Sequence, residues 1–367
     1  MKWNARPLRT AITILTVAAL TVGIGSSVDS KEWMSFGGKT ALFAAKLWNP
    51  DAGQWISMTE QDGSHISSGS LPENGTGTTS STTVETPESD NTTQVNVTTA
   101  PPRSKKGGTV ITDQLSSGNY VVEKVAVKNS ANKSIDIAKQ FSIRPAITVR
   151  KDNTPQVLIL HTHTTECYLG YDAGYYNDDD PTRTRDAKKN MVAVGEAIAE
   201  QLRAAGIGVI HDTTEHDYPQ YNGAYSRSLA TANRVLSQND HIVAVLDIHR
   251  DCIMRSDTEK VKPTVTIDGK QAAQLMILTS VSNTDAVPHP KWKENLRFAL
   301  QLQNNLNTEY EGLMRPLNLV GARYNQHLAP ASMLVEVGSD ANTLDEAIYA
   351  GELFGKEFAA LLVSMQA

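Results

Sequence analysis

Hydrophobic and polar positions alternate regularly after Pro155, where short apolar runs are separated by longer amphipathic stretches. The first run, Val157–Leu160, lies between a proline and polar residues, which predicts a strand buried on both faces. Similar runs predict strands near 209–210, 242–248, 275–278 and 333–337. Apolar residues at helical spacing predict helices over about 190–205, 226–237 and 292–307, and a closing helix after a capping box of Thr343 and Glu346. This order predicts an α/β fold over 154–367, with a mostly parallel central sheet flanked by helices.

The amino-terminal segment carries charge and hydrophobicity in the order typical of a membrane anchor. Lys2, Arg6 and Arg9 precede an uncharged run of about nineteen residues, close to the roughly twenty that cross a bilayer. We expect residues 1–30 to be an uncleaved signal anchor that places the rest of the chain outside the cytoplasm. A cleaved signal peptide is the alternative, with a weak processing site at Gly25–Ser27.

Three further segments precede the predicted α/β domain. Residues 31–65 contain three tryptophans and predict a short juxtamembrane segment. Residues 66–108 are rich in serine and threonine, which is typical of a disordered linker. Residues 109–153 carry short β-like runs and predict a small β-rich lead-in.

Composition narrows the classes of partner. The net charge is −6, and the sequence has no basic segment of the kind that binds nucleic acid. No nucleic-acid partner is therefore expected. The two cysteines, Cys167 and Cys252, are too few for a disulfide framework. Pairing between them and two free thiols both remain open.

Histidine and glutamate side chains follow strands that should end at one edge of the sheet. His163 follows the first predicted strand, His249 ends the third, and Glu336 lies near the end of the fifth. Because the carboxyl ends of parallel strands meet at one edge, these groups should converge, and imidazoles with carboxylates suit zinc. A glutamate inside an apolar strand is costly to bury unless it is paired or beside a metal. Glu336 is therefore predicted as a general base, with an ion pair to Arg227 or Arg323 as the alternative.

Several motifs together resemble one known family, the stage II sporulation protein P family. The resemblance covers about residue 156 to the carboxyl terminus. It rests on the runs His161–Glu166, His211–Leu229, Asp247–Asp251, Arg323–Leu328 and Leu334–Gly338.

That resemblance implies an activity and partners. Members of the family are membrane-anchored peptidoglycan hydrolases of endospore-forming bacteria, active during forespore engulfment. They are N-acetylmuramoyl-L-alanine amidases that also cut peptide crosslinks. Their partners are a lytic transglycosylase, stage II sporulation protein D, and a membrane protein, stage II sporulation protein M. For this chain the resemblance implies a zinc peptidoglycan hydrolase held at the cell membrane by one N-terminal span.

A more distant resemblance to the zinc-dependent cell-wall amidases implies a ligand set. Their first histidine follows a first strand and a later strand ends in histidine, which implies His163, Glu166 and His249 as zinc ligands here. Those amidases place the carboxylate ligand just before the first long helix, where this chain has Asp186. Glu166 or Asp186, and His163 or His161, therefore stay open.

The remaining predicted site residues would bind the substrate or stabilise charge. Arg250 is predicted to be catalytic, as a donor to the oxyanion, and an ion pair with Asp247 or Asp251 is the alternative. Two other functional classes stay open, a non-catalytic peptidoglycan-binding module and a cysteine-dependent hydrolase. The predicted substrate-binding residues are Arg227, Arg323, His327 and Tyr221, the last in a loop rich in aromatic residues.

Overall fold

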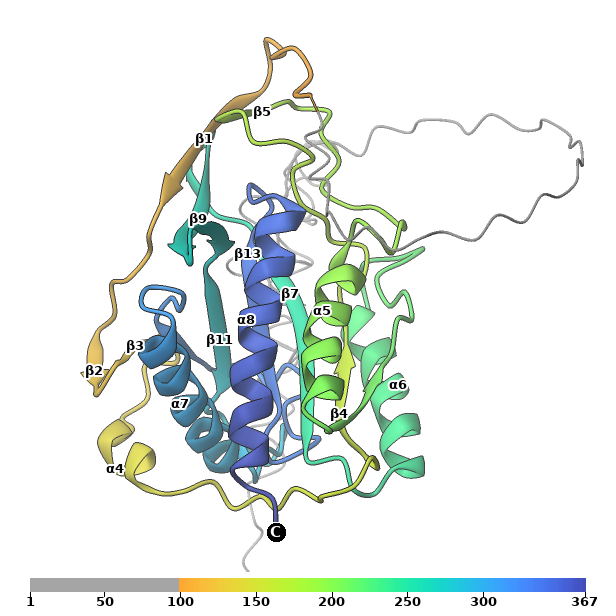
Figure 1. The fold of residues 1–367 in the computed structure, drawn as a ribbon, viewed down its shortest axis with the longest axis vertical. Helices are drawn as coiled ribbons and strands as arrows, with labels where there is room; N and C mark the ends of the chain where they lie inside the picture. Colours follow the sequence, from red (N-terminus) through yellow and green to blue (C-terminus); the bar gives the residue numbers. More distant parts are fainter. Residues whose placement is uncertain (1–98) are drawn as a thin grey trace, which may run out of the picture. The chain divides into compact units, whose positions relative to one another are not determined.

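The computed structural model describes residues 99–367 (Figure 1). The predicted signal anchor at 1–30, the juxtamembrane segment at 31–65 and the linker up to residue 98 lie outside the described residues. Within the described range, no helix combines the length and apolar character that crossing a membrane requires.

The described residues form a mixed α/β fold with two sheets and five helices. The predicted helices and strands of the α/β domain are present, with ends displaced by a few residues at most. The helices are α4 (Ile137–Ser142), α5 (Met191–Ala204), α6 (Ala224–Gln238), α7 (Trp292–Glu309) and α8 (Leu344–Val363), and α8 begins with the predicted capping box. The strands are β1 (Gly108–Asp113), β2 (Tyr120–Val122), β3 (Val125–Asn129), β4 (Pro155–Leu160), β5 (Tyr175–Tyr176), β6 (Gly208–His211), β7 (Ala244–Asp251), β8 (Met254–Ser256), β9 (Glu259–Ile267), β10 (Lys270–Ala273), β11 (Leu275–Ser280), β12 (Leu317–Val320) and β13 (Met333–Ser339).

An eight-stranded sheet organises the fold, in the order β2-β3-β12-β11-β13-β7-β4-β6. Strands β13, β7, β4 and β6 are parallel, but β11 runs antiparallel to β13, and β2 runs antiparallel to β3. The sheet is therefore mixed, and the prediction of a mostly parallel sheet was wrong.

The reversal of β11 follows from the connection that precedes it. A parallel return to the same sheet requires a crossover, which is usually a helix. Between β7 and β11 the chain instead forms β8, β9 and β10, and it enters β11 directly after β10. The apolar run at 275–278 marks the strand correctly, but apolar character carries no information about direction.

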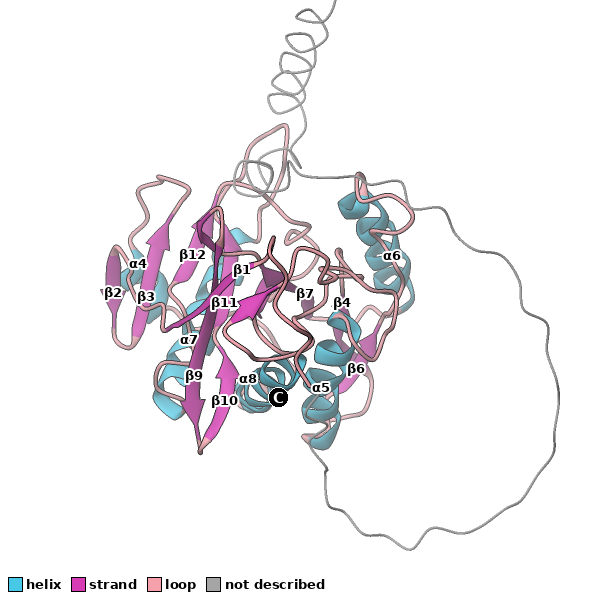
Figure 2. Cartoon of the chain, turned by 90° about the horizontal axis from the view of Figure 1, so that it is seen from above, coloured by secondary structure: helices cyan, strands magenta, loops and turns pink. Residues whose placement is uncertain are grey.

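Helices cover the two faces of this sheet unequally. Helices α5, α7 and α8 pack on one face and form the main core, which includes Phe298 and Phe354. Figure 2 shows α6 on the opposite side of the strands from α5 and α8. There Val235 of α6 packs with Leu160 of β4, and Ala329 from the loop after β12 joins the same cluster. One helix and one loop thus make up the second layer.

The second sheet contacts the carboxyl end of β13. It has five strands in the order β10-β9-β1-β5, with β8 beside β9. The hydroxyl of Ser339 in β13 donates to the carbonyl of Val261 in β9 at 2.7 Å. The segment predicted as a lead-in contributes strands to both sheets, because β1 pairs with β9 and β3 pairs with β12.

Candidate functional site

The turn after β4 carries two of the predicted ligands. Strand β4 ends at Leu160, and His163 and Glu166 lie in the segment that follows. His249 comes from the neighbouring strand β7, which is parallel to β4. One ligand atom from each of the three side chains lies within 4.8 Å of the others, and all three residues are buried. Parallel strands thus bring His163, Glu166 and His249 together.

The cluster holds an ionised carboxylate between two imidazoles. Burial lowers the pKa of His163, which favours the neutral ring that can bind a metal. Burial would raise the pKa of Glu166, but the contacts with His163 and the charge of Arg250 outweigh it and hold that pKa well below its usual range. Glu166 Oε1 is 3.3 Å from His163 Nδ1, and Glu166 Oε2 is 3.6 Å from His249 Nδ1.

Asp247 supports His249 from the same face of β7. Burial disfavours the charged imidazole, but the Asp247 carboxylate outweighs this and raises the pKa of His249 well above its usual range. Asp247 Oδ1 is 3.0 Å from His249 Nε2, and the carboxylate accepts from the Thr162 amide at 2.8 Å and its hydroxyl at 2.6 Å. A carboxylate in this place orients a metal-binding histidine. Asp247 was predicted only as a partner for Arg250, although residues two apart on a strand share a face.

Glu336 lies beside the cluster on β13. It pairs with His249 in the parallel register of β13 and β7, so both side chains leave the sheet on one face. Glu336 is 5% exposed, and its Oε2 has no hydrogen-bond partner within the described residues. Burial, reinforced by the charge of Asp251, raises the pKa of Glu336 to about 8. A carboxyl group that exchanges its proton near neutral pH is suited to general acid–base chemistry.

The donor atoms fit a divalent metal ion. Two imidazoles and a carboxylate form a ligand set found at zinc sites. His163 Nδ1 is buried without a hydrogen bond, because its contact with Glu166 lacks hydrogen-bond geometry. Buried polar atoms left in this state call for an explanation, and an ion is one.

The two alternative ligands are engaged elsewhere. The His161 ring contacts the Ile248 carbonyl at 3.1 Å and His211 Nε2 at 2.9 Å. Asp186 is exposed and accepts from the backbone amide of Lys188 at 3.0 Å. Neither belongs to the cluster of potential ligand atoms.

Arg250 leaves β7 on the face opposite to His249. Its guanidinium donates to three backbone carbonyls, those of Cys167 at 3.1 Å, Thr182 at 2.8 Å and Asp251 at 3.4 Å. These bonds tie the segment after Glu166 to the end of β7. The predicted ion pairs of Arg250 with Asp247 or Asp251 are not among them.

Two further predicted arginines also contact backbone carbonyls. Arg227 donates to the carbonyls of His216, Gln220 and Asn222 and thereby holds the loop between β6 and α6. Arg323 donates to the carbonyl of Pro288 at 3.2 Å. Glu336 Oε2 has no hydrogen-bond partner within the described residues, so no observed contact supports the alternative of a paired structural glutamate.

Tyr221 lies at the cluster of His163, Glu166 and His249, and His327 is not part of that cluster. The Tyr221 ring stacks on His163 with 4.6 Å between ring centres. The guanidinium of Arg183 lies 4.8 Å from the centre of the same Tyr221 ring. Burial, with the nearby charges of Arg323 and Lys291, lowers the pKa of His327 to about 4.

Two residues that contact the cluster were not predicted as site residues from the sequence. Arg183 pairs with Asp217 at 2.6 Å and lies 3.6 Å from Glu166. Tyr225, at the start of α6, lies against both imidazoles, with its ring centre 5.7 Å from that of His163 and 6.3 Å from that of His249. Both contacts join segments that are far apart in the sequence, so no local pattern could have indicated them.

The cysteines are free and poorly placed for nucleophilic chemistry. Burial raises the pKa of both Cys167 and Cys252, the latter to about 12. The Cys167 thiol donates to the carbonyl of Pro181 at 3.2 Å. Because the thiolate is the reactive form, neither thiol is activated.

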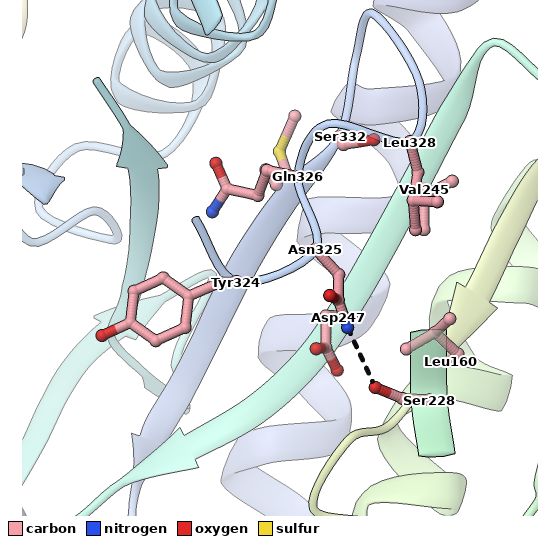
Figure 3. A pocket seen from close by; sticks show the side chains of 10 residues that line it. Leu160, Ser228, Val245, Asp247, Tyr324, Asn325, Gln326, Leu328 and Ser332 are labelled. Carbon is pink, nitrogen blue, oxygen red and sulfur yellow. Dashed lines mark hydrogen bonds between the residues drawn. The ribbon is translucent and has the colours of Figure 1, made fainter. Parts of the chain in front are cut away.

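A crevice adjoins the cluster on the α6 face (Figure 3). Its lining includes Asp247 of β7, Ser228 of α6, and Tyr324 and Asn325 from the loop after β12. In Figure 3 the Asn325 side chain points towards Asp247 and Ser228, and the Tyr324 ring points away from them.

The chain was compared with known families and proteins. Residues 70–359 match the family described as Stage II sporulation protein P. The Stage II sporulation protein P of Bacillus subtilis (strain 168) is 29% identical over 201 residues, which are 52% of this chain and 47% of that protein. The match therefore spans about half the length of this curated relative.

Solved amidase structures are among those that match the chain. An N-acetylmuramyl-L-alanine amidase from Mycobacterium smegmatis has 16% identity and a TM-score of 0.33, over 58% of this chain and 99% of that one. The CwlD amidase from Clostridioides difficile, solved in complex with the GerS lipoprotein, has 16% identity and a TM-score of 0.31, over 56% of this chain and 94% of that one.

Proposed function

The chain belongs to the stage II sporulation protein P family, and from this membership we propose that it is a metal-dependent hydrolase of peptidoglycan amide bonds that acts in sporulation. The observation that carries the proposal is the cluster of His163, Glu166 and His249 with Glu336 on the adjoining strand. Two buried imidazoles, one ionised carboxylate and one carboxyl group of raised pKa form a set that suits hydrolysis.

Zinc is the proposed metal, held by His163, Glu166 and His249. Asp247 would orient His249. Arg183 and Tyr221 would line the site next to His163. When bound, a zinc ion lowers the pKa of water and polarises a carbonyl group.

Glu336 is the proposed proton shuttle. Its carboxylate would take a proton from the attacking water and deliver it to the departing amide nitrogen. The raised pKa makes this group a strong enough base to accept a proton and still able to release it near neutral pH. Glu336 is 5% exposed, so little water reaches it. Electrostatic interactions are stronger where water is excluded.

The proposed substrate bond is the amide between N-acetylmuramic acid and L-alanine, with peptide crosslinks as a second target. We also propose an N-terminal membrane anchor that presents the catalytic domain outside the cytoplasm. The partners proposed are stage II sporulation protein D, the lytic transglycosylase, and stage II sporulation protein M. Family membership supports these proposals.

The test uses full-length protein and purified sacculi, with and without a zinc chelator, and mass spectrometry of the released ends. New lactyl ends on the sugar and free L-alanine amino ends are expected, together with loss of activity in chelator and recovery on adding zinc. Full activity in chelator would refute the metal. Sensitivity to a thiol alkylating reagent in place of chelator would favour the cysteine hydrolase, and binding without cleavage would favour the peptidoglycan-binding module.

A further inference from the structure

The loop after β12 carries two adjacent residues in a backbone conformation that side chains seldom adopt. Tyr324 and Asn325 have φ angles of 45° and 57°. Non-glycine residues in this left-handed region are strained, most of all bulky ones, and they persist where the surroundings hold them. Such positions cluster at functional sites.

Hydrogen bonds connect this loop to the metal-binding cluster. The Asn325 side-chain amide donates to the Tyr225 carbonyl at 2.9 Å and to the Ser228 hydroxyl at 3.2 Å (Figure 3). The Ser228 hydroxyl is 2.7 Å from that of Thr162, which donates to Asp247 at 2.6 Å. Asp247 is the carboxylate that supports His249. The loop is therefore fixed to the same framework as a proposed metal ligand.

The ring of Tyr324 lies over β13 on the face that carries Glu336. It packs against the cluster of Leu278, Val320 and Leu334, and Leu334 and Glu336 are two residues apart on one strand, so their side chains share a face. The Tyr324 ring centre is 5.7 Å from that of Tyr225, whose own ring lies against both imidazoles of the cluster. Burial, reinforced by the charge of Glu336, raises the pKa of the Tyr324 phenol and keeps it protonated.

The Tyr324 hydroxyl makes no hydrogen bond with another of the described residues. A phenol on a half-buried ring usually has such a partner. The guanidinium of Arg250, predicted to stabilise the oxyanion, is occupied by three carbonyls on the other face of β7. The site therefore has a shuttle, Glu336, and a phenol beside it whose proton is available.

We propose that Tyr324 donates a hydrogen bond to the carbonyl oxygen of the scissile amide as that oxygen becomes an anion. The role rests on the proposed function, and it makes Tyr324 a catalytic residue of the same site. Water oxygen bonds to the carbonyl carbon, its proton passes to Glu336, and the carbonyl π pair moves to oxygen, where the phenol donates to it. The carbon–nitrogen bond then breaks, the carbonyl reforms, and the nitrogen takes the proton from Glu336. The phenol keeps its proton throughout.

The test replaces the hydroxyl and keeps the ring. Tyr324→Phe is compared with wild type and with Tyr349→Phe, whose hydroxyl donates to the Ile267 carbonyl away from the site. Full-length proteins act on soluble glycan fragments that carry stem peptides, and zinc content and sedimentation with sacculi are measured in parallel. We expect kcat to fall roughly a hundred- to a thousand-fold in Tyr324→Phe, as for loss of one oxyanion donor, with KM, zinc content and binding unchanged. Tyr349→Phe should retain the wild-type kcat.

Each other outcome overturns a specific claim. A Tyr324→Phe protein with wild-type kcat, or with a raised KM at unchanged kcat, would overturn the role of Tyr324 and leave the proposed function standing. Loss of zinc or of thermal stability along with kcat would show that Tyr324 acts in the framework, which also overturns the inference. A wild-type protein that releases no new ends would overturn the proposed function and the inference together.

Discussion

The two faces of β7 at its carboxyl end carry polar side chains of opposite character. On one face, His249 and the facing Glu336 each keep a buried polar atom without a hydrogen bond. On the other face, Arg250 donates to three carbonyls. Residue type does not separate the two cases, because a buried arginine and a buried histidine both suit catalysis. Hydrogen bonding separates them. A buried polar atom without a hydrogen bond lowers stability, so it is not expected in a residue whose role is only structural.

The largest expected effect is on activity, and it tests the face that carries His249 and Glu336. Glu336→Gln keeps the shape and cannot accept a proton from water, so activity should fall about a hundred- to ten-thousand-fold. Zinc content, measured by mass spectrometry of the protein digest, should stay that of wild type. If Glu336→Gln lost zinc, Glu336 would be a ligand. If it kept near-normal turnover, the shuttle would have to be another group.

On the face of β7 that carries Arg250, a substitution is expected to lower the stability of the fold. Arg250→Met keeps much of the side-chain length and removes the donor for three carbonyls, at a cost of roughly 1–3 kcal/mol for each one left buried without a partner. Chemical denaturation measures the loss, and Arg255→Met, on an exposed ion pair, is the matched control. A stable Arg250→Met protein with strongly reduced kcat would contradict the comparison, because Arg250 would then be catalytic.

An intermediate effect should come from Asp247, which contacts Nε2 of His249, a proposed metal ligand. Asp247→Asn keeps the size and removes the charge beside His249, and loss of such a partner typically weakens metal affinity about 10- to 100-fold. Competition with a chromophoric chelator gives the affinity. Asp212→Asn, which removes a charge paired with Arg234, should leave the affinity unchanged. Equal affinities in Asp247→Asn and wild type would show that His249 needs no such support.

The smallest expected effect is a pH-dependent stability of the metal-free protein. The pKa of Glu336 is raised from 4.5 to about 8 by burial, so its contribution to stability is fully present below about pH 4.5 and is lost as pH rises through about 8. Glu336→Gln cannot ionise, so its melting temperature in chelator should exceed that of wild type by a margin that grows across this window, to roughly ten degrees at most. A constant margin from pH 4 to pH 9 would contradict the raised pKa.

Hydrophobic spacing was sufficient to predict most helices and strands of the α/β domain. Amphipathic periodicity is local, so α5 and the strand at 157–160 follow from their own residues. Strand direction and pairing depend on distant segments. The reversal of β11 and the pairing of β3 with β12 therefore could not be predicted.

The same limit applies to the site. His163 and His249 could be placed because His163 follows β4, His249 lies near the end of β7, and the two strands are parallel. Asp247 could have been found from its spacing to His249. Tyr324 could not, because its position depends on a left-handed backbone and on hydrogen bonds to α6.

The pairing of β3 with β12 has a consequence for how the domain folds. Val127 pairs with Leu317, and Thr109 of β1 pairs with Glu259, so these contacts join residues far apart in the sequence. Closing long loops slows folding, because the entropy of closure must be overcome before any contact forms. Until then β2 and β3 have no partner but each other, and β2 leaves Val121 65% exposed even in the folded state. The first strands in chain order are therefore expected to be among the last to reach their places in the sheets, and this hairpin is where aggregation would begin in a slowly folding chain.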